Sequence, residues 1–266
     1  LHSPISRAGL VGLGLSLAAV LISLLSTIRD QHGQPDEPQG HPQRDVLERL
    51  RQRILTLVGQ IMARNVELAT RRLDAIGVLG QALAELKAAA QQGLVADHIE
   101  TSLMGQAVGA LLGVAKIRGE DADLRLHAIR LLGEIEAPSA VLPLGHLLIR
   151  LYAAPTQRER PLISEVIQAL VGIGFPALGD FKRLLPLEEP WGRAAVGRVY
   201  AETGDERAWD VVTGLLTDPS AAVRNEVAHA VYRFGKEKAL SLVREASDTE
   251  DVLEVRGILL ETLRGW

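Results

Sequence analysis

The sequence predicts an all-α protein in which one membrane-spanning helix precedes a stack of repeated helix pairs. Three observations lead to this prediction: an early apolar run without charges, apolar residues at helical spacing through almost all of the later chain, and a helix–stop–helix pattern that recurs toward the C-terminus. No segment alternates apolar and polar residues as a half-buried strand does.

The composition suits packed helices. Of the 266 residues, 47% are hydrophobic but only 3% are aromatic, so Leu, Ala, Val and Gly supply most of the apolar surface. A net charge of -4 gives no electrostatic reason to expect a nucleic-acid partner. The chain has no cysteine, which excludes disulfides, thiol catalysis and cysteine-ligated zinc.

The first predicted element is a membrane anchor within residues 1–29. The run Ala8–Ile28, AGLVGLGLSLAAVLISLLSTI, has 21 residues and no charge. As a helix it would span roughly 31 Å, the thickness of the hydrocarbon core of a bilayer, so we expect residues 8–28 to contact lipid. A cleaved signal peptide is disfavoured because LISLLSTIRD offers no pair of small residues for cleavage, and a buried core helix because the run has no polar face.

Two further features of this region bear on function. The small residues Gly12 and Ser16, and likewise Gly14 and Ala18, lie one helical turn apart, a spacing that lets another membrane helix pack closely. Such residues are also simply frequent in membrane helices, and both interpretations stay open. Arginines flank the run almost evenly, so the side of the membrane that holds the rest of the chain also stays open. Residues 30–43, DQHGQPDEPQGHPQ, predict a polar linker.

Three long helices are expected next, over about 44–64, 66–91 and 97–117. In the first, apolar residues recur at helical spacing from Val46 to Ile61. The third contains LMGQAVGALLGVAKI, which is short for a membrane span and is expected to be a buried helix. Residues 44–118 fit either degenerate repeats or a separate small bundle.

Residues 119–266 repeat a helix, a stop and a second helix. Glycines 174, 204, 235 and 265 are the stops, spaced 30, 31 and 30 residues apart, and Glu136 holds the matching place 38 residues before the first of them. Glycine ends a helix because it adopts a positive φ without steric cost. Arg125, Arg193 and Arg224 each lie 11 residues before their own stop, which supports the same register. Each pair has an apolar face that only stacking on a neighbour can bury.

These residues resemble HEAT repeats, of the short type also found in phycobilisome-lyase-like proteins. The resemblance is most specific in DPSAAVRNEVAHAVYRFGKEKALSLV and extends over about residues 122–266. It implies a HEAT-like, right-handed α-solenoid, with binding of protein partners far more often than catalysis. The last unit ends after one helix, whose open face we expect either the chain's own tail or a partner to cover.

Alignment on the stops places the partner-binding candidates on the second helices. One row contains Asp180, Asp210 and Ser241, and the next contains Arg183, Thr213 and Arg244. The alternative is that both rows are an ordinary solvated face.

We expect no catalytic, cofactor or metal site, because no catalytic or metal-ligand motif is present. His127, His146 and His229 lie on repeat helices, and none of them is expected to be catalytic or to bind a metal. His127 and His229 precede similar positions in their units and are expected to be structural. The sequence therefore favours a non-catalytic, membrane-anchored scaffold or accessory subunit of a larger membrane complex. The alternatives are a bilin-lyase-like helper of chromophore attachment and an exported receptor-like solenoid.

Overall fold

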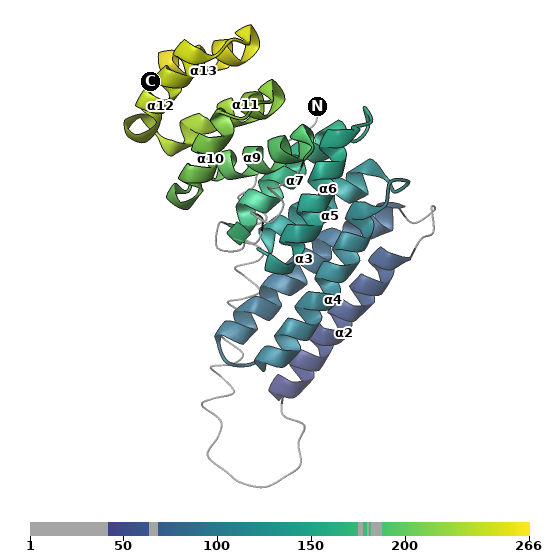
Figure 1. The fold of residues 1–266 in the computed structure, drawn as a ribbon. Helices are drawn as coiled ribbons and strands as arrows, with labels where there is room; N and C mark the ends of the chain where they lie inside the picture. Colours follow the sequence, from purple (N-terminus) through teal and green to yellow (C-terminus); the bar gives the residue numbers. More distant parts are fainter. Residues whose placement is uncertain (1–41, 64–68, 175–177, 180, 182–187) are drawn as a thin grey trace, which may run out of the picture.

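The computed structural model describes residues 42–63, 69–174, 178, 179, 181 and 188–266, and every element in these ranges is helical. Figure 1 shows the helices as antiparallel neighbours in one stack, with α2 at one end and α12 and α13 at the other. The α-helices are α2 (Pro42–Met62), α3 (Ala69–Gln91), α4 (Asp97–Lys116), α5 (Ala122–Glu134), α6 (Val141–Ala153), α7 (Arg160–Ile173), α9 (Pro190–Thr203), α10 (Trp209–Leu216), α11 (Ala221–Ala228), α12 (Lys236–Thr249) and α13 (Leu253–Gly265). Short 3₁₀ turns, η2 (Pro138–Ala140), η4 (Glu206–Ala208) and η5 (Val231–Phe234), accompany them.

The three long N-terminal helices follow the apolar spacing of the sequence. Helix α2 buries Ile54, Leu57 and Ile61, and α4 buries Leu103 and Leu111 within the same continuous core. Helix α2 already begins at Pro42, so the last two residues of the predicted linker belong to the helix. Proline is suited to a first helical turn because no backbone donor is needed there.

The membrane segment and its small-residue pairs, Gly12/Ser16 and Gly14/Ala18, lie outside the described residues. Of the helices that the structure does describe, none is long and apolar enough to cross a bilayer. The expectation that α4 is a buried helix and not a second span agrees with this finding.

Three of the four predicted stop glycines have a positive φ, and of these Gly204 alone adopts the left-handed helical conformation. Gly174, Gly204 and Gly235 have φ values of 88°, 59° and 78°, and Glu136 has the same positive sign at 53°. Glu136 is the one residue other than glycine with a positive φ in the described ranges, so the register of the repeat outweighs the usual preference for glycine. Gly204 is also held by contact, because an added Cβ would lie 2.9 Å from the carbonyl oxygen of Arg233.

Two details of the predicted register are wrong. Gly265 has no positive φ and is the last residue of α13. The first helix that begins at residue 221 does not continue to Gly235, because α11 ends at Ala228 and the 3₁₀ turn η5 follows. A 3₁₀ turn tightens the end of a helix, and here it sets the Phe234 ring edge-on against Trp209 at a centroid distance of 5.2 Å.

Helices α5 and α7 approach each other most closely at a glycine. A Cβ added to Gly133 would lie 2.7 Å from the Cα of Ala169, closer than real contacts allow. Gly172 lies on the opposite helix near the same point, with its own added Cβ 3.5 Å from the Gly133 carbonyl oxygen. Small residues at this crossing therefore set the distance between two neighbouring units.

We expect Gly133→Ala to lower the free energy of unfolding by about 2 kcal/mol, because the added methyl group must push the two backbones apart. Urea unfolding of the full chain in a mild detergent, followed by circular dichroism, measures the change. Gly109→Ala is the matched control, since Gly109 is exposed on α4 with nothing within 4 Å of an added Cβ. Its expected effect is a gain of up to about 1 kcal/mol from helix propensity. Equal stability of the two variants would contradict the close approach.

Candidate functional site

The structure describes four of the six residues in the predicted partner-binding rows. Asp210 on α10 is exposed, as are Ser241 and Arg244 on α12. Thr213 is half-buried, and its hydroxyl donates a hydrogen bond to the carbonyl oxygen of Trp209 at 2.9 Å. Asp180 and Arg183 lie outside the described residues. The contact role of these rows stays a prediction.

Four arginines in first helices form one recurring bridge. Arg72, Arg125, Arg193 and Arg224 each pair with an acid that stands immediately before the next first helix. The paired acids, in the same order, are Glu120, Glu159, Asp218 and Glu250. In the unit with Gly174, Ile163 holds the arginine position, so the series is interrupted at α7.

Each of these guanidinium groups also donates to a backbone carbonyl that lies in the last turn of the preceding helix or in the connection after it. Arg72 donates from Nε to Ile61 at 2.9 Å, and Arg125 donates from Nε to Ala115 at 3.0 Å. Arg193 and Arg224 do the same from Nη1, to Glu188 at 3.0 Å and to Asp218 at 2.9 Å. One side chain therefore ties the segment before its helix to the connection after its unit.

The bridge between Arg224 and Glu250 shows the geometry in full. Arg224 donates from Nε and Nη2 to the two carboxylate oxygens at 2.8 Å and 2.7 Å, and the backbone N–H of Val252 donates to the same carboxylate. The hydrogen bonds from Arg224 lower the pKa of Glu250 to about 2. The pKa of Asp218 is lowered in the same way by Arg193, and the pKa of Glu120 by Arg72.

A second network joins α6, α9 and α11. The Tyr152 hydroxyl donates to Glu226 at 3.0 Å, and Arg198 reaches both Glu226 at 3.3 Å and Glu202 at 2.7 Å. Burial, followed by the nearby Glu226 carboxylate, raises the pKa of the Tyr152 phenol. These groups are mutually satisfied, which indicates a structural role.

The structural role expected for the histidines has partial support. His127 contacts the carbonyl oxygen of Asp123 on its own helix at 2.8 Å, whereas His229 is exposed at the end of α11. His146 is exposed and lines a cavity. Within the described part of the chain, no three His, Asp or Glu side chains are grouped as a metal site would require.

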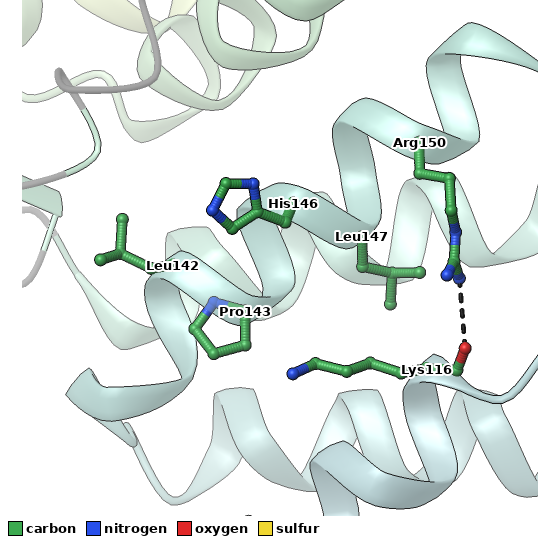
Figure 2. Close-up of a pocket in the computed structure, with 6 residues that line it drawn as sticks. All are labelled: Lys116, Leu142, Pro143, His146, Leu147 and Arg150. Carbon is green, nitrogen blue, oxygen red and sulfur yellow. Dashed lines mark hydrogen bonds between the residues drawn. The ribbon is translucent and has the colours of Figure 1, made fainter.

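That cavity is the candidate functional site. It has a volume of about 460 Å³ and lies where the C-terminal end of α4 meets α6 (Figure 2). Arg150 donates from Nη2 to the carbonyl oxygen of Lys116 at 3.3 Å, which fixes the guanidinium at one end. The lining residues are Lys116, Leu142, Pro143, His146, Leu147 and Arg150.

The charge of this cavity is positive and incompletely matched. Burial, and then repulsion by Arg118 and Arg125, lowers the pKa of Arg150, while Glu159 acts in the opposite direction. Glu159 is already engaged by Arg125 at 3.3 Å and by the Thr156 hydroxyl at 2.9 Å. The Nε of Arg150 and the Nη2 of Arg125 are buried without a hydrogen-bond partner among the described residues. A buried cationic donor left in this state favours an anionic ligand.

Part of this site was within reach of the sequence alignment. Leu142 lies six residues after the stop at Glu136, as Asp210 and Ser241 lie six residues after theirs. If the row of Asp210 and Ser241 is extended to the helix pair with the stop at Glu136, it includes Leu142. His146 and Arg150 follow Leu142 one and two helical turns later on the same face. Lys116 could not have been found this way, because it comes from another helix pair and only the packing of α4 against α6 brings it close.

A second cavity, of about 430 Å³, opens at the other end of the N-terminal helices. Arg44 and Leu47 of α2 line it together with Leu86, Val95 and Ile99. Ile99 lies six residues after Gly93, whose φ is also positive at 70°, so this pair follows the same register.

Comparison with known proteins identifies the repeat. A family model described as HEAT repeats matches residues 181–264, about a third of the chain. This segment therefore carries HEAT repeats, which generally mediate protein–protein interaction, and it includes Asp210, Ser241 and Arg244. The match is to HEAT repeats in general and gives no support to the phycobilisome-lyase-like subtype. No curated protein matches the chain.

Two solved structures are similar in part. The crystal structure of an engineered protein is 17% identical, with a TM-score of 0.38, and the match covers 79% of this chain and 95% of that one. The structure of human deoxyhypusine hydroxylase in complex with glycerol is 15% identical, with a TM-score of 0.33, and covers 83% and 99%. Both scores are low, so neither likeness supports a conclusion about this chain.

We expect Glu250→Gln to lower the free energy of unfolding at pH 7 by about 3 kcal/mol, because it removes the buried charge partner of Arg224 and leaves only the exposed carboxylate of Asp251 beside the guanidinium. The pKa of Glu250 is lower in the folded state than its ordinary value of 4.5, so its contribution is complete above about pH 5 and is lost as the pH falls toward 2. Urea unfolding at several pH values should show the variant and the parent converging in acid.

Glu245→Gln is the control for this measurement, since Glu245 is exposed on the same helix. Its stability should follow the parent at every pH. A difference between Glu250→Gln and the parent that stayed constant down to pH 2 would contradict the role of the carboxylate.

Proposed function

We propose that this protein is a membrane-anchored, non-catalytic scaffold that binds a protein partner within a larger membrane complex. The observation that carries the proposal is the run of HEAT repeats over residues 181–264. Repeats of this kind offer a long surface whose shape is fixed by stacking, and their function resides in the residues that surface exposes.

The arginine bridges support this role because they hold successive units in register. Arg193 and Arg224 connect three consecutive first helices, α9, α11 and α13, through Asp218 and Glu250. A surface held in this way keeps Asp210 on α10 and Arg244 on α12 at a fixed separation. Preorganisation of this type favours binding, since less conformational entropy is lost when the partner docks.

Membrane anchoring rests on the sequence of residues 8–28 alone. Its uncharged length matches a bilayer, and the polar linker that follows would place the helices outside the membrane. In the proposed arrangement the anchor packs beside other membrane helices of the complex through Gly12, Gly14, Ser16 and Ala18.

The anchor is tested by fractionation of cells that produce the full chain. We expect the protein to stay in the membrane pellet after carbonate extraction, because a spanning apolar helix is not released by high pH. Sequencing of the N-terminus of the mature protein should find residues 8–28 still present. A soluble protein that begins after residue 28 would instead identify a cleaved leader.

The scaffold role is tested by cross-linking the full chain in native membranes, purification in mild detergent and mass spectrometry. We expect cross-links from α10 and α12 to one recurrent protein, and a loss of its recovery of about tenfold in the double variant Ser241→Arg/Arg244→Glu, which adds a positive charge at residue 241 and reverses the charge at residue 244. Arg264→Gln on α13 is the control. A lone monomer without cross-linked partner would refute the scaffold role.

A further inference from the structure

The cavity between α4 and α6 contains cationic groups that the fold itself does not use. Lys116 is exposed, and its Nζ has no ion pair or hydrogen bond within the described part of the chain. Arg150 donates a hydrogen bond from one Nη to the carbonyl oxygen of Lys116, while its Nε is buried without a partner among the described residues. Cations at the end of a helix stabilise its free carbonyls, but that role accounts for the Nη contact and not for the remaining donors.

The shape of the cavity argues for an extended ligand. Leu142, His146 and Arg150 follow one another at intervals of four residues along α6, so the stripe is roughly 12 Å long. A single small anion would occupy one end of it, whereas three or four residues of an extended peptide match its length. The stripe is also mixed in character, with Leu142 and Pro143 beside the charged groups.

Figure 2 shows how the apolar and the charged side chains are distributed along the cavity. The Lys116 side chain runs beneath Pro143 and Leu147, and the Arg150 guanidinium lies at the opposite end of the stripe from Leu142. An acidic side chain could therefore meet Arg150 or Lys116 while a neighbouring apolar side chain contacts Leu142 and Pro143. This pairing of an apolar anchor with a charge-assisted hydrogen bond is how short peptide segments are recognised.

The linker of the same chain cannot supply this ligand. Its acidic residues are Asp30, Asp36 and Glu37. Asp30 stands between Arg29 and Gln31 and so has no apolar neighbour, whereas Asp36 and Glu37 precede Pro42 by six and five residues, which reach at most about 22 Å. The cavity lies near the opposite end of α2, since Met62 is the neighbour of Gly113 on α4. A helix of 21 residues is about 31 Å long, so the two acids fall short of Arg150.

We propose that the cavity formed by Lys116, Leu142, Pro143, His146 and Arg150 binds an extended segment of a partner protein in which an acidic residue stands next to an apolar one. The inference rests on the proposed function, because it takes the ligand to be part of a protein partner. It adds a binding site on α6, outside the segment that matches HEAT repeats, and it specifies the chemistry of the bound segment.

The test measures fluorescence anisotropy of two labelled peptides with the full chain in mild detergent. One peptide has two adjacent acidic residues between leucines, and the other has the corresponding amides. We expect the acidic peptide to bind and the amide peptide to bind at least about tenfold more weakly, with affinity falling as salt is added.

Variants of the cavity assign the site. Arg150→Gln should weaken the acidic peptide by about tenfold, and Lys116→Gln, which changes an exposed side chain and leaves the fold intact, by about threefold. Arg264→Gln removes the same charge from α13 and should change nothing. Equal binding of both peptides, or unchanged affinity in both cavity variants, would overturn the proposal.

Two further outcomes would also overturn it. Displacement of the acidic peptide by millimolar inorganic phosphate would show a site for a small anion, and displacement by phosphatidylserine vesicles but not by phosphatidylcholine vesicles would show a lipid site. Either result leaves the scaffold role standing, because that role is tested on Ser241 and Arg244. Conversely, if the cross-linking experiment refuted the scaffold role, the peptide measurements would still show whether the cavity binds an acidic segment.

Discussion

The fold depends on a buried guanidinium that is satisfied on two sides at once. Arg72 and Arg125 are 5% and 2% exposed, and burying such a charge is costly unless it is paired with an opposite charge and hydrogen-bonded. The acceptors are a carbonyl in the last turn of the preceding helix and a carboxylate that stands before the next first helix. Because the two acceptors belong to different units, the hydrogen bonds can be completed only when the units stack in one register.

This constraint explains why the repeat tolerates variation elsewhere. The acids differ in type and in distance along the chain, as Glu120 and Asp218 illustrate, yet each reaches its arginine from the same place in the fold. Ile163 replaces the arginine that would connect α7 to the next first helix, α9. At the junction between α5 and α7, by contrast, the Arg125–Glu159 bridge is combined with the close crossing at Gly133 and with the ion pair of Arg130 with Glu165 at 2.9 Å.

The candidate site follows from the same arrangement. Arg125 donates to a carbonyl at the end of α4 and pairs with Glu159. Arg150 donates to a carbonyl at the same helix end, and no acid among the described residues forms an ion pair with it. The surplus of positive charge is a local consequence of two helix pairs meeting, in a protein whose net charge is -4. A scaffold that must recognise an acidic segment can obtain selectivity from such a cavity without a general positive surface that would attract other polyanions.

The helical class, the register and the position of most stops could be predicted from the spacing of residues along the chain. Gly204 and Gly235 were predictable because their spacing repeats, and Glu136 was predictable despite being no glycine, because the same spacing pointed to it. Gly265 shows the limit of this reasoning. Gly265 lies at the same interval but has no positive φ. Spacing alone does not show whether the chain turns back at a given residue.

Which residues meet across units depends on how the helices pack. The acids of the bridges lie at varying distances from their arginines because helices and loops of different length intervene, so no fixed interval in the sequence identifies them. The cavity is formed in the same way, from Lys116 at the end of one helix pair and Arg150 on the next. Periodicity specifies the face of a helix, whereas a site between units depends on how far one helix is displaced along its neighbour, and that displacement is fixed by side-chain packing.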